Sequence, residues 1–435
     1  MDLPVRRAKP LLGDLHIPGD KSISHRAALL AALGNGTSVL HGFLEAQDPH
    51  STIRCLRSLG IRVETSGEEV RVHGRGLRGL SAPTNDLHAG NSGTTLRLLS
   101  GILAGHPFES VLTGDDSLRR RPMNRIVEPL TLMGASVKAT NGKPPVRIRG
   151  KERLKPISYT LPVPSAQVKS AILLAGLYAD GVTTVEEPVQ TRDHTERMLG
   201  LQVQRHADRI SVSVAGGMTI PSREFRIPGD ISSAVFLIAA AACIKGSDCV
   251  IRRVGINPTR SAVLDVLQHS GVRIEKINCL EDDAEPLCDL HVAFSPPEHP
   301  VHIDPGTTPL VIDEIPALAV LAACARVGFS VEGAGELRVK ESDRIALLSE
   351  NLRRWGIDVR EHQNGFRFDP PASLREATIE SGGDHRIAMA FAVAGMVHGG
   401  ITINEAECAD VSFPGFWNLV ERLVAGKPGP YSRMT

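Results

Sequence analysis

Apolar and polar residues follow one pattern along the chain, and this pattern recurs six times. In each copy a turn of small or polar residues precedes a run rich in Ala, Leu and Ile, which has the length and composition of a buried helix. The six segments are IPGDKSISHRAALLAAL (17–33), AGNSGTTLRLLSGILAG (89–105), PVPSAQVKSAILLAGL (162–177), IPGDISSAVFLIAAAA (227–242), VIDEIPALAVLAACA (311–325) and SGGDHRIAMAFAVAG (381–395). Measured from Gly19, Gly90, Pro164, Gly229, Asp313 and Gly383, the spacings are 71, 74, 65, 84 and 70 residues, so the repeat accounts for the whole chain.

A second helical segment follows within each copy, and it also opens on polar residues. The six segments are DPHSTIRCLRSLGI, RRRPMNRIVEPLTLMGA, TRDHTERMLGL, NPTRSAVLDVLQHSGV, KESDRIALLSENLRRWGI and SFPGFWNLVERL. Five of them close on a glycine beside an apolar residue, which is typical of a helix C-terminus. Short runs rich in Val, Ile and Thr, such as TSVLHGF and VTTVEEP, precede these helices and predict strands. Each copy is therefore expected to form a strand, a helix, a strand, a helix and a strand pair.

Six α/β copies of this size exceed one compact core, so two domains of three copies each are expected. The duplicated IPGD motif indicates where the chain crosses from one domain to the other. The first domain is predicted to span residues 19–229, and the second to combine residues 1–18 with residues 230–435. Helix N-termini from both domains would then line the cleft between them. The functional site is expected in that cleft, which should close over a ligand.

Basic residues are frequent at the predicted helix entrances. A helix N-terminus offers unpaired N–H groups and the positive end of the helix dipole, so it attracts anions and repels Lys and Arg. Polar caps are ordinary there, but cations are not, and their recurrence predicts a small polyanionic ligand. The polar and basic residues at these entrances are Lys21, Ser22, Arg26, Asn91, Arg97, Arg121, Ser165, Gln167, Lys169, Arg192, Arg260, Lys340, Arg344, His385 and Arg386.

The composition narrows the class of protein. Hydrophobic residues make up 42% of the 435 residues but aromatic residues only 4%, so the cores must be aliphatic and closely packed. The 49 basic and 49 acidic residues balance, so no overall charge attracts nucleic acid or a membrane surface. The 7 cysteines form no CxxC pair, and the N-terminus lacks the apolar stretch of a signal peptide. A soluble cytoplasmic protein with buried free thiols is expected.

Six short motifs occur in order at the repeat spacing: GDKSISHR, SAQVK, RDHTE, NPTR, KESDR and GDHRIAM. Together they resemble the 5-enolpyruvylshikimate-3-phosphate synthase family, in the subgroup called class II, along essentially the full length. The resemblance implies an α/β fold: a two-domain inside-out α/β barrel of six repeated βαβαββ units, three per domain. It also implies a cytoplasmic monomer that uses no metal ion and no organic cofactor, and that binds neither nucleic acid nor membrane.

The resemblance further implies an enzyme of the shikimate pathway, which leads to chorismate and the aromatic amino acids. Its reaction transfers the enolpyruvyl group of phosphoenolpyruvate to the 5-hydroxyl of shikimate 3-phosphate and releases phosphate. Two polyanions held side by side need several cations, since a charge-assisted hydrogen bond contributes about 1.5–3 kcal/mol. The residues implied for shikimate 3-phosphate are Lys21, Ser22, Arg26, Ser165, Gln167, Arg192, Asp313 and Lys340. Those implied for phosphoenolpyruvate are Lys21, Gly93, Arg121, Gln167, Glu341, Arg344, His385 and Arg386.

The chemistry needs one proton removed from the 5-hydroxyl and one delivered to the methylene carbon of phosphoenolpyruvate, through a tetrahedral intermediate. Two carboxylates on opposite sides of the reacting centre can do both. Asp313 is the candidate base and Glu341 the candidate acid, while Lys21 and His385 are candidates for stabilising charge and relaying protons. Without the resemblance, Asp313 and Glu341 would be interpreted as helix caps. How the two carboxylates divide the roles stays open, because coupled groups share their titration.

Three positions refine these expectations. Val411, in ECADVSFPGFW, stands where many family members carry a lysine, so the phosphoenolpyruvate site is expected to have one cation fewer. Gly93, in GNSGTTLR, stands where glyphosate-tolerant class II members have alanine, whose methyl group crowds the inhibitor. We therefore expect glyphosate to inhibit this protein. The second IPGD motif continues with Ile231, Ser232 and Ser233 instead of basic residues, and is predicted to be a hinge and packing element.

Other functions fit parts of the pattern. The sister enzyme that transfers enolpyruvyl to UDP-N-acetylglucosamine has the same six units, but it carries a cysteine in the loop before its second-unit arginine, and LTGDDSLRRRPM has none. A non-catalytic anion-binding repeat scaffold would explain the basic entrances but not the carboxylates Asp313 and Glu341 among them. Few aromatic residues and a neutral charge argue against an RNA-end-processing enzyme. The GDD of the same loop, which precedes Arg119, Arg120, Arg121 and Arg125, is interpreted as a solvated or salt-bridged turn and not as a metal site.

Overall fold

The computed structural model describes residues 2–207, 209–280 and 285–427, and in it the chain forms two compact units. Unit 1 comprises Met1–Pro18, Pro228–Asp282 and Pro286–Thr435, and unit 2 comprises Gly19–Ile227 and Asp283–Glu285. The chain thus leaves unit 1 between residues 18 and 19 and returns to it between residues 227 and 228. Glu285 belongs with unit 2, where its Oε1 lies 2.7 Å from Nδ1 of His194.

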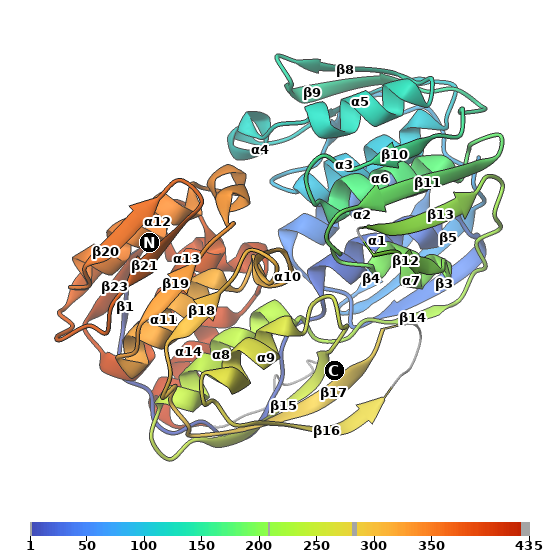
Figure 1. The fold of residues 1–435 in the computed structure, drawn as a ribbon. Helices are drawn as coiled ribbons and strands as arrows, with labels where there is room; N and C mark the ends of the chain where they lie inside the picture. The colour runs from blue at the N-terminus through green and yellow to red at the C-terminus, as the bar shows by residue number, and fades with distance from the viewer. Residues whose placement is uncertain (1, 208, 281–284, 428–435) are drawn as a thin grey trace. The chain divides into compact units, whose positions relative to one another are not determined.

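Unit 2 carries three four-stranded sheets that share one strand order (Figure 1). In each sheet the first two strands run parallel, and a hairpin adds two antiparallel strands. The sheets are β14 (Glu224–Arg226), β3 (Asn35–His41), β5 (Glu69–Arg75) and β4 (Arg62–Ser66); β6 (Leu87–His88), β7 (Glu109–Thr113), β9 (Lys143–Arg149) and β8 (Ser136–Thr140); and β10 (Ser158–Thr160), β11 (Val182–Glu187), β13 (Ile210–Ala215) and β12 (Val203–Arg205).

Unit 1 repeats this order in two sheets and varies it in the third. The sheets are β2 (Leu12–Leu15), β15 (Asp248–Gly255), β17 (Leu287–Ala293) and β16 (Ile274–Leu280); β18 (Val301–Ile303), β19 (Phe329–Val331), β21 (Gly365–Phe368) and β20 (Val359–His362); and β22 (Ala377–Glu380), β23 (Ile401–Asn404) and β1 (Leu3–Val5). In the last sheet the N-terminal strand β1 pairs antiparallel with β23, in the place that a hairpin strand takes elsewhere. The expected α/β class with three repeats per unit is confirmed, and only this last strand pair departs from it.

The first helix of each repeat is buried on nearly every side, whereas the strands alternate between buried and exposed positions, as β9 does. The helices therefore fill the interior of each unit, and the sheets face outward. These first helices are α1 (Lys21–Leu33), α3 (Gly93–Ala104), α6 (Ala166–Gly176), α8 (Ile231–Cys243), α11 (Ile315–Ala325) and α13 (His385–His398). The second helices are α2 (Gln47–Ser58), α5 (Asn124–Leu132), α7 (His194–Leu199), α9 (Ala262–His269), α12 (Arg344–Arg354) and α14 (Phe416–Ala425). Short helices add α4 (Asp116–Arg120), α10 (Thr308–Val311), η1 (Gly335–Val339) and η2 (Ala406–Val411).

Small residues let the central helices approach closely, as the low aromatic content predicted. A side chain at Gly101 of α3 would overlap the backbone carbonyl of Ala171 in α6, so only glycine permits this contact. The two units have separate aliphatic cores. In the part of the chain that the structure describes, every helix falls short of the length or apolar character that a membrane span needs.

Both IPGD motifs lie where a strand of one unit leads into a helix of the other. Strand β2 precedes α1 in the chain, but it pairs in parallel with β15 of unit 1. Strand β14 precedes α8, but it pairs in parallel with β3 of unit 2. Glycine is required at the first crossing because a Cβ at Gly19 would overlap the carbonyl oxygen of Gly42. The motif thus occurs at both places where the chain passes from a strand of one unit to a helix of the other.

Candidate active site

A buried arginine holds the predicted catalytic carboxylates of unit 1 in one cluster. Arg344 begins α12, and only 1% of its side chain is exposed. Its Nη1 lies 3.3 Å from Oδ1 of Asp313, its Nη2 donates to Oε2 of Glu341 at 2.6 Å, and its Nε donates to Oδ2 of Asp384 at 2.7 Å. Burial alone would lower the pKa of Arg344, but the three carboxylates outweigh it and raise the pKa above its ordinary value. The guanidinium is thus permanently charged and oriented by its anionic neighbours.

Local helix chemistry explains how Arg344 reaches these partners. Asp343 caps α12 through the backbone N–H of Ala346, which places Arg344 in the first turn. Asp384 is completely buried and caps α13, with its Oδ1 accepting from the backbone N–H of Arg386 at 3.0 Å. The same carboxylate therefore fixes both the start of α13 and the side chain of Arg344. The motif GDHRIAM contains Asp384, but the sequence does not reveal its role, because a cap and an ion-pair partner cannot be told apart in sequence.

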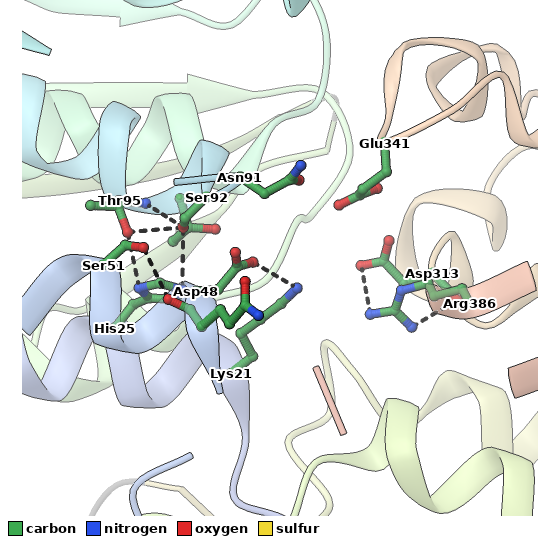
Figure 2. A network of polar contacts seen from close by, with 12 residues as sticks. Lys21, His25, Asp48, Ser51, Asn91, Ser92, Thr95, Asp313, Glu341 and Arg386 are labelled. Atoms are coloured by element: carbon green, nitrogen blue, oxygen red, sulfur yellow. Dashed lines mark hydrogen bonds and ion pairs between the residues drawn. The ribbon is translucent and has the colours of Figure 1, made fainter. Parts of the chain in front are cut away.

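Asp313 is surrounded by cations. Lys340 Nζ lies 3.7 Å from its Oδ1, and Arg386 Nη2 lies 3.9 Å from its Oδ2. Arg386 also donates from Nη1 to the backbone carbonyl of Asp313 at 2.9 Å (Figure 2). His385 is the buried first residue of α13, next to Arg386. The structure thus brings Asp313, Lys340, Glu341, Arg344 and Arg386 together, and His385 adjoins this cluster as the neighbour of Arg386 in the chain.

A second polar group lies at the helix N-termini of unit 2. Lys21 is the first residue of α1, and its Nζ lies 3.2 Å from Oδ2 of Asp48 in α2 (Figure 2). Arg121 follows α4 and donates to Oδ1 of Asn91 at 2.5 Å, while Asn91 donates to Oδ2 of Asp115 at 2.8 Å. Asp48 was missed in the sequence, because it lies inside the second helical segment and far from Lys21 along the chain.

Gly93 begins α3 and lies close to the guanidinium groups of Arg97 and Arg121. A Cβ built at Gly93 would lie 2.7 Å from Nη1 of Arg97 and 3.4 Å from Nη1 of Arg121. Arg97 in turn donates to Oε1 of Gln167 at 2.6 Å, and Gln167 donates to Oγ1 of Thr94 at 3.0 Å. Gly93 therefore leaves the space next to these donors open. The arrangement joins Gly93, Arg121 and Gln167, all three predicted for phosphoenolpyruvate, at the N-termini of α3 and α6.

The remaining predicted residues of unit 2 are less closely connected. Ser165 caps α6 and accepts from the backbone N–H of Val168 at 3.4 Å. Ser22 and Arg192 are half-buried at the starts of α1 and α7. Arg26 is buried and donates to Oγ1 of Thr195 at 2.8 Å and to Oγ of Ser170 at 2.9 Å. Burial lowers the pKa of Arg26 to about 10, although Glu196 and Asp20 oppose this shift. Its role as a substrate ligand stays a prediction.

Two of the cations at the helix entrances, Lys169 and Arg260, form buried ion pairs inside their own units. Lys169 is buried between Glu187 and Glu196, at 2.7 Å from an oxygen of each. Arg260 is buried at the entrance of α9 and lies 3.2 Å from Oδ1 of Asp230. In the sequence, Lys169 and Arg260 are among the basic residues that predict a polyanionic ligand. Their carboxylate partners come from other segments, and no local pattern indicates them.

A neutral histidine supports the region below Lys21. His25 is fully buried, with its Nδ1 2.7 Å from Oγ1 of Thr52 and its Nε2 3.5 Å from Oγ of Ser92, the residue that caps α3 (Figure 2). Burial lowers the pKa of His25 well below 6.5, and the charges of Lys21 and Arg26 add to this effect. The imidazole is therefore uncharged near neutral pH, and it links α1, α2 and α3 without adding charge.

Val411 ends the 3₁₀ helix η2 and brings no cation to its surroundings. The sequence had indicated this departure from the family pattern. Among the residues of unit 1 that the structure describes, the cations Lys340, Arg344 and Arg386 each lie within 4 Å of a carboxylate oxygen of Asp313 or Glu341.

Known proteins resemble this chain over nearly its whole length. The profile of a family described as EPSP synthase (3-phosphoshikimate 1-carboxyvinyltransferase) matches residues 5–420. A 3-phosphoshikimate 1-carboxyvinyltransferase of Solibacter usitatus is 47% identical over 428 residues, which cover 97% of this chain and 100% of the relative. A protein of the same name from Geotalea uraniireducens is 46% identical over 97% of this chain and 98% of its own.

Solved structures agree with the sequence relatives. The structure of an EPSP synthase from Acinetobacter baumannii superposes with a TM-score of 0.85 at 43% identity, covering 97% of this chain and 98% of that one. A second structure of an Acinetobacter baumannii EPSP synthase gives a TM-score of 0.84 at 42% identity. Fold, site residues and full-length similarity lead to one conclusion: this chain belongs to the EPSP synthase family.

Proposed function

We propose that this chain transfers the enolpyruvyl group of phosphoenolpyruvate to the 5-hydroxyl of shikimate 3-phosphate and releases phosphate. The observation that carries the proposal is the pair of carboxylates, Asp313 and Glu341, that share the buried guanidinium of Arg344 in a chain of the EPSP synthase family. An acid and a base are both needed for this addition and elimination. The names of the relatives describe the same activity.

Asp313 is the proposed base. In the addition step the 5-oxygen of shikimate 3-phosphate attacks C2 of phosphoenolpyruvate, while its proton passes to the Asp313 carboxylate and another proton joins C3. Lys340, Arg344 and Arg386 lie within 4 Å of this carboxylate and hold it in place. In the elimination step C3 loses a proton and the bond from C2 to the phosphate oxygen breaks, so phosphate leaves and the enol ether remains.

Glu341 is the proposed acid, and Arg344 explains how it changes protonation state. In this structure Glu341 accepts a hydrogen bond from Nη2 of Arg344 at 2.6 Å. Guanidinium groups bind carboxylates in a bidentate way, so the carboxylate of phosphoenolpyruvate can replace Glu341 on Arg344. Glu341 would then face an anion instead of a cation, and a carboxyl group in that setting binds a proton more readily. Substrate binding thereby prepares the group that delivers a proton to C3.

The helix N-termini of unit 2 supply the proposed phosphate and carboxylate donors. Lys21, Arg121 and Gln167 carry N–H donors, and Gly93 leaves the adjacent space open. Lys21 is proposed to contact both substrates and, with His385, to stabilise the charge that develops in the tetrahedral intermediate. The other ligands implied by the resemblance, Ser22, Arg26, Ser165 and Arg192, belong to the same proposal for shikimate 3-phosphate. The resemblance also supports a cytoplasmic monomer without metal ion or organic cofactor.

Phosphate release from phosphoenolpyruvate tests the activity directly. We expect release when shikimate 3-phosphate is the acceptor and none when UDP-N-acetylglucosamine takes its place. The Asp313→Ala variant, checked for folding by circular dichroism, is the control for release by a contaminant and is expected to release phosphate about 10²–10⁴ times more slowly than the parent. Release only with the sugar nucleotide would place the activity with the sister enzyme, and no release with either acceptor from folded protein would refute the proposal.

The Gly93→Ala change is expected to make the enzyme tolerant of glyphosate, which we expect to inhibit the parent at millimolar or lower concentration. The added methyl group would lie 2.7 Å from Nη1 of Arg97, so this side chain must move and the space beside Arg121 shrinks. We expect the inhibitory concentration of glyphosate to rise at least tenfold, with a smaller rise in KM for phosphoenolpyruvate. Gly328→Ala, where the new Cβ would have only ordinary contacts of 3.5 Å or more, is the matched control and should leave inhibition unchanged. A parent enzyme that millimolar glyphosate does not inhibit would contradict this prediction.

A further inference from the structure

Glu314 is a buried carboxylate to which neither the family resemblance nor the proposed mechanism gives a role. It directly follows Asp313 and is the residue before the first turn of α11. Its side chain is 0% exposed, and its Oε2 accepts no hydrogen bond from any residue that the structure describes. An ionised carboxylate in such a place is costly unless other groups compensate it. The carboxylate of Glu314 therefore needs an explanation beyond packing.

Its other oxygen ends a short chain of polar contacts. Ser232, in the first turn of α8, donates its hydroxyl to Oε1 of Glu314. Arg260 donates from Nη2 to that hydroxyl at 2.7 Å and lies 3.5 Å from Oε1 of Glu314. Asp230, the cap of α8, completes the group with its Oδ1 3.2 Å from Nη2 of Arg260. All four side chains are buried, so this cluster ties the starts of α8, α9 and α11 together.

The cluster acts next to the proposed base. Arg386 donates to the backbone carbonyl of Asp313 at 2.9 Å. Ser232 and Arg260 hold the side chain of the next residue, Glu314. The backbone that carries the Asp313 carboxylate is thus fixed both at Asp313 and at the residue that follows it. Reacting groups must be held within about 0.5 Å of their productive position, and an error of about 1 Å can lower a rate about 100-fold.

A purely stabilising role does not account for this arrangement. A buried ion pair seldom stabilises a fold more than well-packed apolar residues of the same volume would. The neighbouring residues in α11 are Ile, Pro, Ala and Leu, so the chain elsewhere fills this interior with apolar groups. A charged residue directly after Asp313 in the chain points to a task at the site.

We propose that Glu314 is a positioning residue: anchored by Ser232 and Arg260, it sets the direction of the Asp313 carboxylate among Lys340, Arg344 and Arg386. This inference rests on the proposed function for its effect on turnover, but the placement of Asp313 can also be observed without turnover. It also gives the second IPGD motif a specific part in the site, since Asp230 and Ser232 belong to that helix entrance.

Two variants weaken the anchor in different ways. Glu314→Gln keeps the shape and removes the charge, whereas Ser232→Ala keeps both charges and removes the hydroxyl between them. We expect each to lower kcat at least tenfold, with the KM of either substrate changed less than threefold. Because both act through Asp313, neither should lower kcat by more than twofold in an Asp313→Asn background. Asp289→Asn, which removes a buried carboxylate 2.6 Å from Arg252 in the same unit, is the matched control and should keep the parent kcat.

A carbon-13 carboxyl spectrum reads the position of Asp313 independently of activity. The Asp313 resonance, assigned by its loss in Asp313→Asn, is expected to shift in Glu314→Gln and Ser232→Ala but not in Asp289→Asn. If the parent shows no turnover but the resonance shifts, the proposed function fails and the positioning role stands. An unshifted resonance in both variants, or a kcat loss that persists fully in the Asp313→Asn background, would overturn the positioning role.

Discussion

Changing Glu341 to glutamine is expected to lower kcat by a factor of roughly 10²–10⁴, the range that a general acid contributes. Glutamine keeps the size of the side chain and can still accept from Nη2 of Arg344, but it cannot deliver a proton to C3 of phosphoenolpyruvate. The loss should therefore appear in kcat, with little change in the KM for shikimate 3-phosphate. Steady-state phosphate release, with each substrate varied in turn, measures both quantities.

Glu350→Gln provides the matched control for this experiment. Glu350 lies on the same helix as Arg344 and pairs with Arg354 at 2.6 Å, but its side chain is 56% exposed. Loss of such a surface pair changes stability by about 0–1 kcal/mol, so kcat should stay at the parent value. Glu341→Asp, which restores an acid on a shorter side chain, is expected to recover part of the activity. A Glu341→Gln enzyme within threefold of the parent kcat would show that another group donates the proton.

Changing Lys169 to methionine is expected to destabilise unit 2 by about 3–5 kcal/mol, the effect of breaking a buried ion pair from one side. Both carboxylate partners, Glu187 and Glu196, are buried and would lose their cation. Calorimetry should show a lower melting temperature, by about 2–4 °C for each kcal/mol in a unit of this size. Lys138→Met, at an exposed position of β8 in the same unit, is the control and should melt like the parent.

The pH dependence of this variant follows from the same groups. Burial raises the pKa of Glu196 above 4.5 even though Lys169 opposes it, and loss of Lys169 must raise it further. A carboxyl group with a raised pKa in the folded state stabilises fully below its unfolded pKa and loses this contribution as the pH rises. The gap in melting temperature between variant and parent should therefore narrow as the pH falls toward 4.5. A gap that widens on acidification would contradict this account.

In the parent protein, the ion pairs of Lys169 with Glu187 and Glu196 should weaken at high pH. Burial lowers the pKa of Lys169, but the charges of Glu196 and Glu187 outweigh it and raise the pKa above 10.5. Its contribution to stability is complete below that value and is lost as the pH rises through the folded-state pKa.

Much of the repeat architecture could be predicted because it is encoded locally. The Ala-rich helices and the Val- and Ile-rich strands lie where their periodicity places them, and the polar residues expected at the helix starts include the caps Ser92 and Asp230. Which carboxylate a lysine or arginine at a helix start will pair with is not encoded locally. Lys169 and Lys21 look alike at the start of a helix, yet the partners that decide their roles, Glu196 and Asp48, come from other segments. Only the folded chain distinguishes a cation that is neutralised in the core from one at the site.

The two IPGD motifs show this limit clearly. In the first copy the cation, Lys21, is on the first helix and its acid, Asp48, is on the second. In the other copy the acid, Asp230, caps the first helix and the cation, Arg260, comes from the entrance of the second. Both copies therefore contain an ion pair with opposite polarity. The sequence shows that, of the two helices that follow an IPGD motif, only α1 begins with basic residues. It does not show that Arg260 supplies the cation that pairs with Asp230 in the second copy.

The pairing of strands within each unit sets an order of events during translation. Every strand of unit 2 lies between residues 19 and 227, so all three of its sheets can form before the rest of the chain is synthesised. In unit 1, by contrast, Leu3 of β1 pairs with Ile403, and Leu12 of β2 pairs with Asp248. Strands β1 and β2 are synthesised long before the segments with which they pair, so they stay unpaired until those segments are made. Their shortness, together with Pro4 in β1 and Asp14 in β2, makes them poor templates for aggregation during that time.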